Sequence, residues 1–330
     1  KVGSKVREYK IGDNVMTRMP INKIGAFAEY VAVNSNAIAI MPKNMSYVEA
    51  AAVPLTGLTA YQVLNDVLKV KSHESIFLPG GTGGLGGILI PIAKKMELKV
   101  ITNGSENGYD RLLKMGVDKY INYKEENYED ILSNIDYVID TLGPNDLDKE
   151  LKILKPHGKI VSLKGIPNYK FALENRYPLW KRLLFKLVGN KYDRMASKQD
   201  KEYYFFFVKE NGEQLAKVSN ILESHNIKPA IDSVYDFTKI NEALDTDFFT
   251  FKEGMLNLNA IEKNDNHKFR KHSSVYDLAN YCKLYENYGQ IEQLLIVFIE
   301  QLSQCDTDVN TEDLANSFCE SEVNGFLGIE

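Results

Sequence analysis

The sequence predicts an α/β protein organised around a doubly wound parallel sheet. A short apolar run, residues 75–78, is followed by residues 80–87, in which six of eight are glycine, and then by the helical pattern of residues 88–96. Further apolar runs alternate with helical patterns at the spacing of repeated βαβ crossovers. The 330 residues, 44% hydrophobic and 26% charged, are typical of a globular protein long enough for two lobes.

Six strands and three intervening helices follow from this alternation. The expected strands are residues 75–78, 99–102, 118–123, 137–140, 159–163 and 203–208. The expected helices are residues 88–96, 109–115 and 145–154. In an open parallel sheet of this kind, the ligand crevice lies at the carboxyl ends of the strands.

The glycine-rich turn carries the sharpest functional signal. Glycine has no Cβ, so the turn can take positive φ values and let a bulky anion approach the backbone. The helix that follows offers unpaired N–H groups and the positive end of its dipole, which suits a pyrophosphate. A lone glycine turn could equally be a tight structural connection. The strands and helices around it favour a dinucleotide site.

The turn after the second strand favours NADP over NAD. NAD sites commonly place an acidic residue about 20 residues beyond the glycines, where it accepts hydrogen bonds from the ribose. Here Asn103, Gly104 and Ser105 follow the strand directly, and Glu106 comes late. Asn103 and Ser105 offer neutral donors for a 2′-phosphate, although an ordinary polar turn would be compatible with either cofactor.

Charge and cysteine content exclude several classes of protein. The net charge of −5 gives no reason to expect nucleic acid or a membrane as a partner. Cys282, Cys305 and Cys319 come too late in the chain for a cysteine-ligated zinc in the first part, and we expect no metal site. The sequence opens without an apolar leader, and the apolar run 294–299 is too short to span a bilayer, so we expect a soluble cytoplasmic protein.

The chain changes character near residue 255. Residues 1–254 carry 35 basic and 32 acidic side chains, whereas residues 255–330 carry 5 basic and 13 acidic ones. The second part includes a helical pattern with one apolar face, residues 291–302. We expect a mostly helical acidic tail that patches the rest of the protein, forms a dimer or belongs to an unrelated fused sequence.

Several motifs within residues 1–244 resemble the medium-chain dehydrogenase/reductase superfamily. The segments that carry the resemblance, in order, are Val2-Gly3-Ser4-Lys5-Val6, residues 9–15, residues 25–30, residues 50–60, Ile121-Asn122-Tyr123-Lys124 and Asp140-Thr141-Leu142-Gly143. The closest branch is the zinc-independent one, which contains NADPH-dependent quinone oxidoreductases and alkenal or enone reductases. This resemblance implies a Rossmann NADP-binding domain beside a GroES-like β lobe.

The resemblance also implies a set of cofactor-binding residues and no assigned catalytic residue. The implied residues are Thr59, Gly80, Thr82, Gly83, Gly84, Leu85, Gly86, Ser105, Tyr123, Thr141, Leu142, Gly143, Leu163 and Lys164. Thr59 would lie near the nicotinamide, and Ser105 and Tyr123 near the 2′-phosphate. Each has a plainer alternative: Thr59 could cap a helix, Tyr123 could pack at a surface, and glycines at strand ends could be only turns.

The resemblance divides the chain into four parts. Residues 1–45 would form a partial GroES-like substrate lobe, residues 46–225 the Rossmann NADP-binding domain, residues 226–254 a return segment to the lobe, and residues 255–330 the tail. The opening strands and the closing strand of the family's substrate lobe have no counterpart in this sequence. We therefore expect cofactor binding with weak or absent turnover.

The activity implied by the resemblance is zinc-free, NADPH-dependent hydride transfer to a quinone or an α,β-unsaturated carbonyl. A homodimer joined through sheet edges is implied as well. The alternative is a nucleotide-binding or interaction protein that has lost turnover.

Two further segments bear on this activity. Tyr203 or Tyr204 is a candidate proton donor, because a phenol is protonated at neutral pH, but the aromatic run that they begin is more simply a buried strand. Residues 177–188 have apolar residues three and four apart, which predicts an amphipathic helix that begins after Pro178. We expect it to serve as a lid or a packing helix; basic amphipathic helices also bind membranes, but a single short one more often faces the core.

Overall fold

The computed structural model of the chain describes residues 1–20, 26, 28–231 and 233–239. The chain separates into two compact units, Lys1–Val234 and Tyr235–Glu330. The second unit contributes one 3-10 turn, η4 (Phe237–Lys239), to the described residues. The acidic tail expected at residues 255–330 lies outside them, and the four-part division of the chain stays a prediction.

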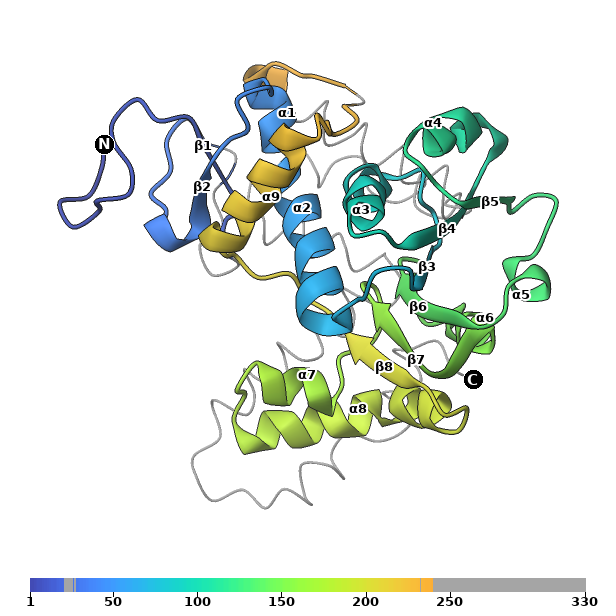
Figure 1. Ribbon diagram of the computed structural model, residues 1–330. Helices are drawn as coiled ribbons and strands as arrows, with labels where there is room; N and C mark the ends of the chain where they lie inside the picture. The colour runs from blue at the N-terminus through green and yellow to red at the C-terminus, as the bar shows by residue number, and fades with distance from the viewer. Residues whose placement is uncertain (21–25, 27, 232, 240–330) are drawn as a thin grey trace, which may run out of the picture. The chain divides into compact units, whose positions relative to one another are not determined.

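A six-stranded parallel sheet organises the first unit (Figure 1). Its strands are β3 (Ser75–Leu78), β4 (Lys99–Gly104), β5 (Lys119–Asn122), β6 (Ile135–Asp140), β7 (Leu154–Ser162) and β8 (Glu202–Phe205). They lie in the order β5-β4-β3-β6-β7-β8, so the chain runs outward from β3 and then returns to its other side. This is the predicted doubly wound sheet, with its switch of direction between β3 and β6.

Helices connect the strands and cover both faces of the sheet (Figure 1). They are α1 (Tyr47–Ala51), α2 (Val53–Gln62), α3 (Gly84–Lys95), α4 (Tyr109–Lys114), α5 (Tyr128–Ile131), α6 (Leu147–Ile153), α7 (Tyr169–Glu174), α8 (Leu179–Ser197) and α9 (Gly212–Ser224). Short turns of other helix types are η1 (Ser35–Ala37), the π-helical η2 (Val63–Leu68) that continues α2, and η3 (Glu106–Gly108).

The side chains of β3 alternate between two cores. Ile76 and Leu78 are fully buried in a cluster that includes residues of α2 and α3. Phe77 faces the other side, where its ring contacts Tyr128 of α5 at a centroid distance of 4.8 Å. A strand that is apolar on both faces is typical of a sheet covered by helices on both sides.

The first residues of the chain form a small second sheet. Strands β1 (Val15–Thr17) and β2 (Ile38–Ile40) pair antiparallel. Helix α9 packs against β2, and the Ser219 hydroxyl donates a hydrogen bond to the Ile40 carbonyl at 2.8 Å. This sheet occupies the region in which the sequence suggests a partial β lobe.

Element boundaries differ from the predicted ones in a few places. β8 ends at Phe205 rather than at residue 208, and β7 begins five residues before the predicted start. Helix α8 starts directly after Pro178, as predicted, but continues to Ser197. No helix within the described part of the chain is long and apolar enough to cross a membrane.

Candidate cofactor-binding site

The glycine turn lies between the carboxyl end of β3 and the first turn of α3. Gly80 has a φ of +67°, a conformation that side chains rarely adopt. The Gly83 N–H donates to the Gly80 carbonyl at 3.1 Å, and Gly83 then precedes α3 as its N-cap residue. The buried strand and the buried helix thus hold a turn whose tip, at Gly83 and Gly84, is exposed.

The glycines of this turn do two different things. A Cβ on Gly81 would come within 2.1 Å of the Thr102 hydroxyl oxygen, and one on Gly86 within 2.0 Å of the Gly81 carbonyl oxygen. By contrast, a Cβ on Gly84 would meet nothing within 4 Å, and one on Gly83 only the Gly80 carbonyl oxygen at 3.4 Å. Gly81 and Gly86 therefore permit close backbone packing, whereas Gly83 and Gly84 leave open space in front of the helix.

The start of α3 has the character of an anion site. No side chain caps its first N–H groups, and no acidic residue lies in its first turn. Its 12 residues align enough peptide dipoles to place about half a positive charge at this end. Uncapped N–H groups behind an open glycine surface fit the pyrophosphate predicted from the sequence.

Two side chains at the end of β4 brace the glycine turn. The Gly80 N–H donates to Asn103 Oδ1 at 2.7 Å, and the Gly81 N–H donates to Thr102 Oγ1 at 3.0 Å. Thr102 Oγ1 in turn donates to the Leu78 carbonyl at 2.5 Å. The sequence suggests Asn103 as a phosphate ligand. In the structure its side chain instead accepts a hydrogen bond from the glycine turn and stabilises that turn.

The predicted 2′-phosphate residues lie at the ends of the next two strands. Ser105 directly follows β4, and its carbonyl accepts a hydrogen bond from the Tyr120 hydroxyl at 2.5 Å. Tyr123 directly follows β5 and is exposed. Because parallel strands end at one edge of the sheet, both residues lie at the same edge as the glycine turn.

Arg111 is a residue of this edge that the sequence patterns do not single out. Its guanidinium, projecting from α4, donates a hydrogen bond to the Thr82 carbonyl in the glycine turn. The Thr82 methyl group packs so closely on Gly104 and Gly108 that neither could carry a Cβ, which would lie 2.7 and 2.1 Å from it. Arg111 therefore brings a positive charge to the glycine turn. In the sequence this residue lies six positions after Ser105, and that spacing is the signal that could have identified it.

The turn after β6 is organised by Asp140, another residue outside the predicted set. This buried carboxylate accepts hydrogen bonds from the N–H groups of Leu142 (2.8 Å) and Gly143 (2.7 Å) and from the Ser162 hydroxyl. Burial raises the pKa of Asp140, and these hydrogen bonds partly oppose the shift. Gly143 has a φ of +104°, so glycine is required where the chain turns back.

The predicted residues after β6 and β7 lie beside one another. The Thr141 hydroxyl donates to the Pro79 carbonyl at 2.8 Å, which ties the β6 turn to the glycine turn. The Leu163 N–H donates to the Asp140 carbonyl at 2.9 Å, and Lys164 lies against Gly143. Burial lowers the pKa of Lys164, while the nearby Asp140 opposes that shift. These contacts hold the turns after β3, β6 and β7 next to one another at one edge of the sheet.

Thr59 and the tyrosines of β8 are placed differently. Thr59 is buried within α2, a helix that packs against α3, rather than on a turn at the sheet edge. Tyr203 is buried, and its hydroxyl both accepts from the Ile166 N–H and donates to the Ile166 carbonyl, each at 3.0 Å. The Tyr204 hydroxyl donates to Glu202 Oε2 at 2.6 Å. Tyr203 therefore has a structural role, which agrees with the buried-strand alternative.

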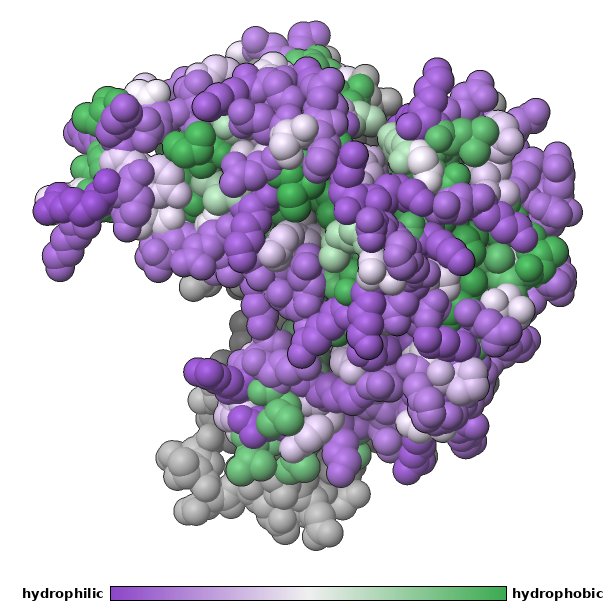
Figure 2. Space-filling model, viewed as in Figure 1, coloured by the Kyte–Doolittle hydropathy of each residue, from purple (hydrophilic) through white to green (hydrophobic). Residues whose placement is uncertain are grey.

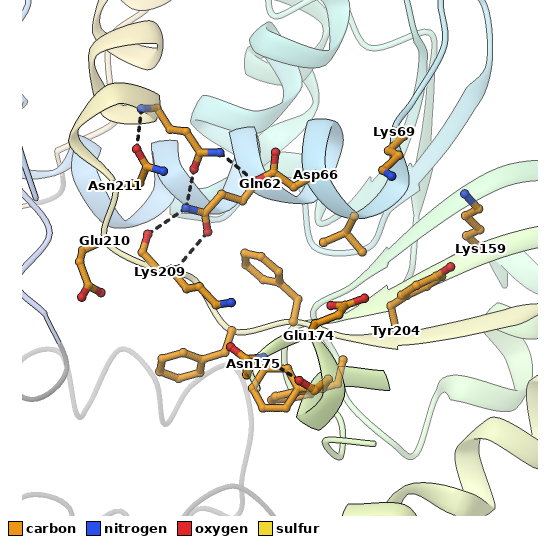
Figure 3. A pocket seen from close by; sticks show the side chains of 16 residues that line it. Gln62, Asp66, Lys69, Lys159, Glu174, Asn175, Tyr204, Lys209, Glu210 and Asn211 are labelled. Carbon is orange, nitrogen blue, oxygen red and sulfur yellow. Dashed lines mark hydrogen bonds between the residues drawn. The ribbon is translucent and has the colours of Figure 1, made fainter. Parts of the chain in front are cut away.

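A separate cavity of about 410 Å³ lies between α2, α7 and the segment after β8 (Figure 3). Its polar walls are largely paired with each other: Gln62 Nε2 donates to the Lys209 carbonyl and to Gln214 Oε1, and Gln214 Nε2 donates to Asp66 Oδ2, all at 2.8 Å. No residue of the glycine turn lines it. The cavity is therefore distinct from the candidate cofactor site.

The chain is similar to known dehydrogenases, reductases and oxidoreductases. Residues 115–246 match the model of a family described as zinc-binding dehydrogenase. The chain is 32% identical over 256 residues to the 2-methylene-furan-3-one reductase of Solanum lycopersicum, a match that covers 74% of this chain and 56% of that protein. The chain thus spans little more than half the length of this relative.

Two solved structures share the fold. The quinone oxidoreductase of Coxiella burnetii has a TM-score of 0.61 at 25% identity, covering 74% of this chain and 72% of that one. The Escherichia coli quinone oxidoreductase complexed with NADPH has a TM-score of 0.54 at 26% identity, covering 71% and 70%. Among the described residues no group of three or more His, Cys, Asp or Glu could hold a metal ion, and the expected lack of zinc stays a prediction.

Proposed function

Because this chain belongs to the medium-chain dehydrogenase/reductase superfamily, we propose that it is an NADPH-dependent oxidoreductase that transfers hydride to a quinone or an α,β-unsaturated carbonyl. The observation that carries the proposal is the glycine turn, open at Gly83 and Gly84 in front of the uncapped α3. The names of its relatives, a furanone reductase and quinone oxidoreductases, support the substrate class.

In this proposal, a different group of residues at the carboxyl ends of the strands would bind each part of NADPH. The N–H groups of Gly84 and Leu85 at the start of α3 would hold the pyrophosphate. Ser105 and Arg111 would hold the 2′-phosphate, one with a hydroxyl and one with a positive charge. The turns after β6 and β7 would line the nicotinamide half.

The chemistry asks for positioning more than for reactive side chains. A bound NADPH supplies the hydride, and with it both electrons, to the electrophilic carbon of the substrate. The reduced product must then take up one proton. Since the Tyr203 hydroxyl is buried and hydrogen-bonds with the Ile166 backbone, we propose that solvent supplies this proton. The strand-end turns then serve to orient the two reacting carbons.

The charge distribution at the end of β4 supports NADPH over NADH. The strand ends at Gly104 and Ser105 follows it directly, so no carboxylate stands at the strand end to repel a 2′-phosphate; Glu106 comes one residue later, and Arg111 lies on α4. Fluorescence titration should give a lower Kd for NADPH than for NADH. Equal dissociation constants would contradict this part of the proposal.

One experiment separates the proposed enzyme from a binding protein without turnover. The chain is mixed with NADPH and a panel of quinones and enones, and nicotinamide absorbance is followed together with cofactor fluorescence. Substrate-dependent loss of absorbance supports the oxidoreductase, and fluorescence enhancement without turnover supports the binding protein. The implied homodimer, which would use an edge strand such as β8, is measured by analytical ultracentrifugation.

A further inference from the structure

Helix α8 turns a row of leucines toward solvent. Leu179, Leu183 and Leu187 are 72%, 56% and 78% exposed. They recur every four residues, so they lie along one face of the helix. Figure 2 shows hydrophobic side chains reaching the surface over α7 and α8, in the lower part of the view. Exposed positions of a surface helix are normally polar, so this face calls for an explanation.

The packing face of α8 lies on the other side of the helix. Its buried residues are Phe185, Gly189 and Ala196. The Phe185 ring lies 6.0 Å from that of Phe171 and 5.6 Å from that of Tyr177. At about 100° per residue, the three leucines fall roughly opposite this buried face. The expectation that the apolar residues of this helix pack on the protein is therefore correct for its buried face. It is wrong for Leu179, Leu183 and Leu187, which are exposed.

Aromatic and positively charged side chains border the leucine face. Trp180 is 41% exposed, and Lys181 Nζ lies 5.1 Å from its ring centroid. Lys186 and Lys191 are exposed and flank the leucines on the two sides of the helix. Over its length α8 carries five basic residues and one acidic residue, Asp193. A leucine face with a tryptophan and flanking lysines is the composition of helices that lie in a membrane interface.

We propose that the leucine face of α8 is a docking surface for an anionic lipid bilayer. The leucines would enter the boundary between headgroups and acyl chains, with the helix axis parallel to the membrane plane. Trp180 would sit at headgroup level, and Lys186 and Lys191 would contact lipid phosphates. The inference departs from the sequence-based expectation of no membrane partner, because net charge of the whole chain conceals a local excess of four positive charges on α8.

Charge favours a bilayer over a second copy of this chain as the occupant. In a two-fold symmetric contact each copy presents the same surface, so the basic residues of the two α8 helices would face one another. Bringing like charges together opposes such a contact, whereas anionic headgroups complement them. An acidic segment of the same chain could also cover the leucine face. The vesicle titration distinguishes such a segment from a bilayer.

The sole tryptophan of the chain makes this surface directly observable. The full chain is titrated with vesicles of phosphatidylcholine, with and without phosphatidylserine, while Trp180 emission is recorded and binding is measured by flotation. We expect a blue shift and co-flotation with the anionic vesicles only. Raised salt should weaken the binding, because it screens the lysines.

Matched variants assign the effect to the leucine face. The double variant Leu183→Glu, Leu187→Glu should lose both the shift and the flotation. Leu55→Glu is the control: Leu55 is 56% exposed, like Leu183, but lies on α2. Both variants alter exposed side chains, and circular dichroism confirms that each is folded.

Charge reversal tests the lipid phosphates separately. Lys186→Glu should weaken the apparent vesicle affinity more than about tenfold. Lys95→Glu, an exposed lysine of α3, should leave it unchanged.

Three outcomes would overturn the proposal. The first is unchanged Trp180 emission and no flotation with anionic vesicles. The second is a blue shift without lipid that grows with protein concentration, which would show a second copy covering the face. The third is a concentration-independent blue emission without lipid that Leu183→Glu abolishes, which would show that another segment of the same chain covers it.

Discussion

Helices α3 and α8 are both rich in large apolar residues, yet they use them in opposite ways. In α3 seven of twelve residues are buried, because the helix packs between the sheet and α2. In α8 only three of nineteen are buried, and Leu179, Leu183 and Leu187 face solvent. The comparison shows that an apolar pattern predicts a helix, while the number of neighbouring elements determines how many of its apolar residues are buried.

In both helices a glycine permits a close approach to the backbone of a neighbouring segment. A Cβ on Gly86 of α3 would lie 2.0 Å from the Gly81 carbonyl oxygen, and one on Gly189 of α8 would lie 2.6 Å from Asn168 Cα. In each case the helix touches backbone rather than a flexible side chain. The close approach in α3 holds the glycine turn against the helix, whereas the one in α8 lies on the face opposite the exposed leucines.

The largest expected effect comes from filling the contact in α3. Gly86→Ala should destabilise the protein by about 4 kcal/mol or more, because its methyl group would overlap the backbone of Gly81. Chemical denaturation measures the change, with Gly87→Ala as the control, since a Cβ on Gly87 meets nothing within 4 Å. Equal stability of the two variants would show that the turn adapts freely.

Removing the packing face of α8 should cost nearly as much. Phe185→Ala deletes a buried ring that contacts Phe171 and Tyr177, so we expect a loss of about 3 kcal/mol. Leu187→Ala removes an exposed side chain of the same helix and should change stability by less than about 0.5 kcal/mol. A large loss for Leu187→Ala in thermal or urea unfolding would mean that this face is covered.

A substitution at the open tip of the turn should affect binding without affecting folding. Gly83→Val places its side chain in open space, where we expect the pyrophosphate to lie. The Kd for NADPH should rise about a hundredfold, which corresponds to about 2.7 kcal/mol. Fluorescence titration of the folded variant is the measurement, and an unchanged Kd would reduce the turn to a structural connection.

Helix α6 buries the carboxylate of Glu150 where an apolar residue would be usual. The free energy of unfolding should therefore depend on pH. Both oxygens of Glu150 are buried without a hydrogen-bond partner. Burial raises the pKa of Glu150 well above its ordinary value, and the neighbouring Asp140 and Asp146 raise it further. The folded protein therefore keeps a proton that the unfolded chain releases.

This retained proton sets the sign of the pH dependence. The stabilisation is fully present below the ordinary pKa of a glutamate, and it is lost as pH rises from there toward the folded pKa. The unfolding free energy should fall by up to about 1.4 kcal/mol per pH unit across that window. Glu150→Gln should flatten the slope in denaturation series, while Glu126→Gln, at an exposed position, should leave it. A slope that survives Glu150→Gln would assign it to another group.

Local patterns were enough to predict the sheet and to propose which of its edges carries the candidate site. The apolar run before the glycines, the helical pattern after them and the repeated alternation predicted the strands β3 to β8 in order, because strand and helix periodicity are properties of consecutive residues. The same patterns placed the turns after β3, β6 and β7 at one edge, since parallel strands end together. The family resemblance added the expected cofactor and substrate class.

Tertiary structure decided what neighbouring residues cannot specify. The contacts of Gly81 with Thr102 and of Gly86 with Gly81 separate these two glycines from the open Gly83 and Gly84. The hydrogen bond from Arg111 to Thr82 brings a positive charge to the turn. Tyr203 became structural through its bonds to Ile166, 37 positions away. The exposed leucines of α8 follow the same rule. A helical pattern shows which residues share a face, but which face is buried depends on the elements that pack against it.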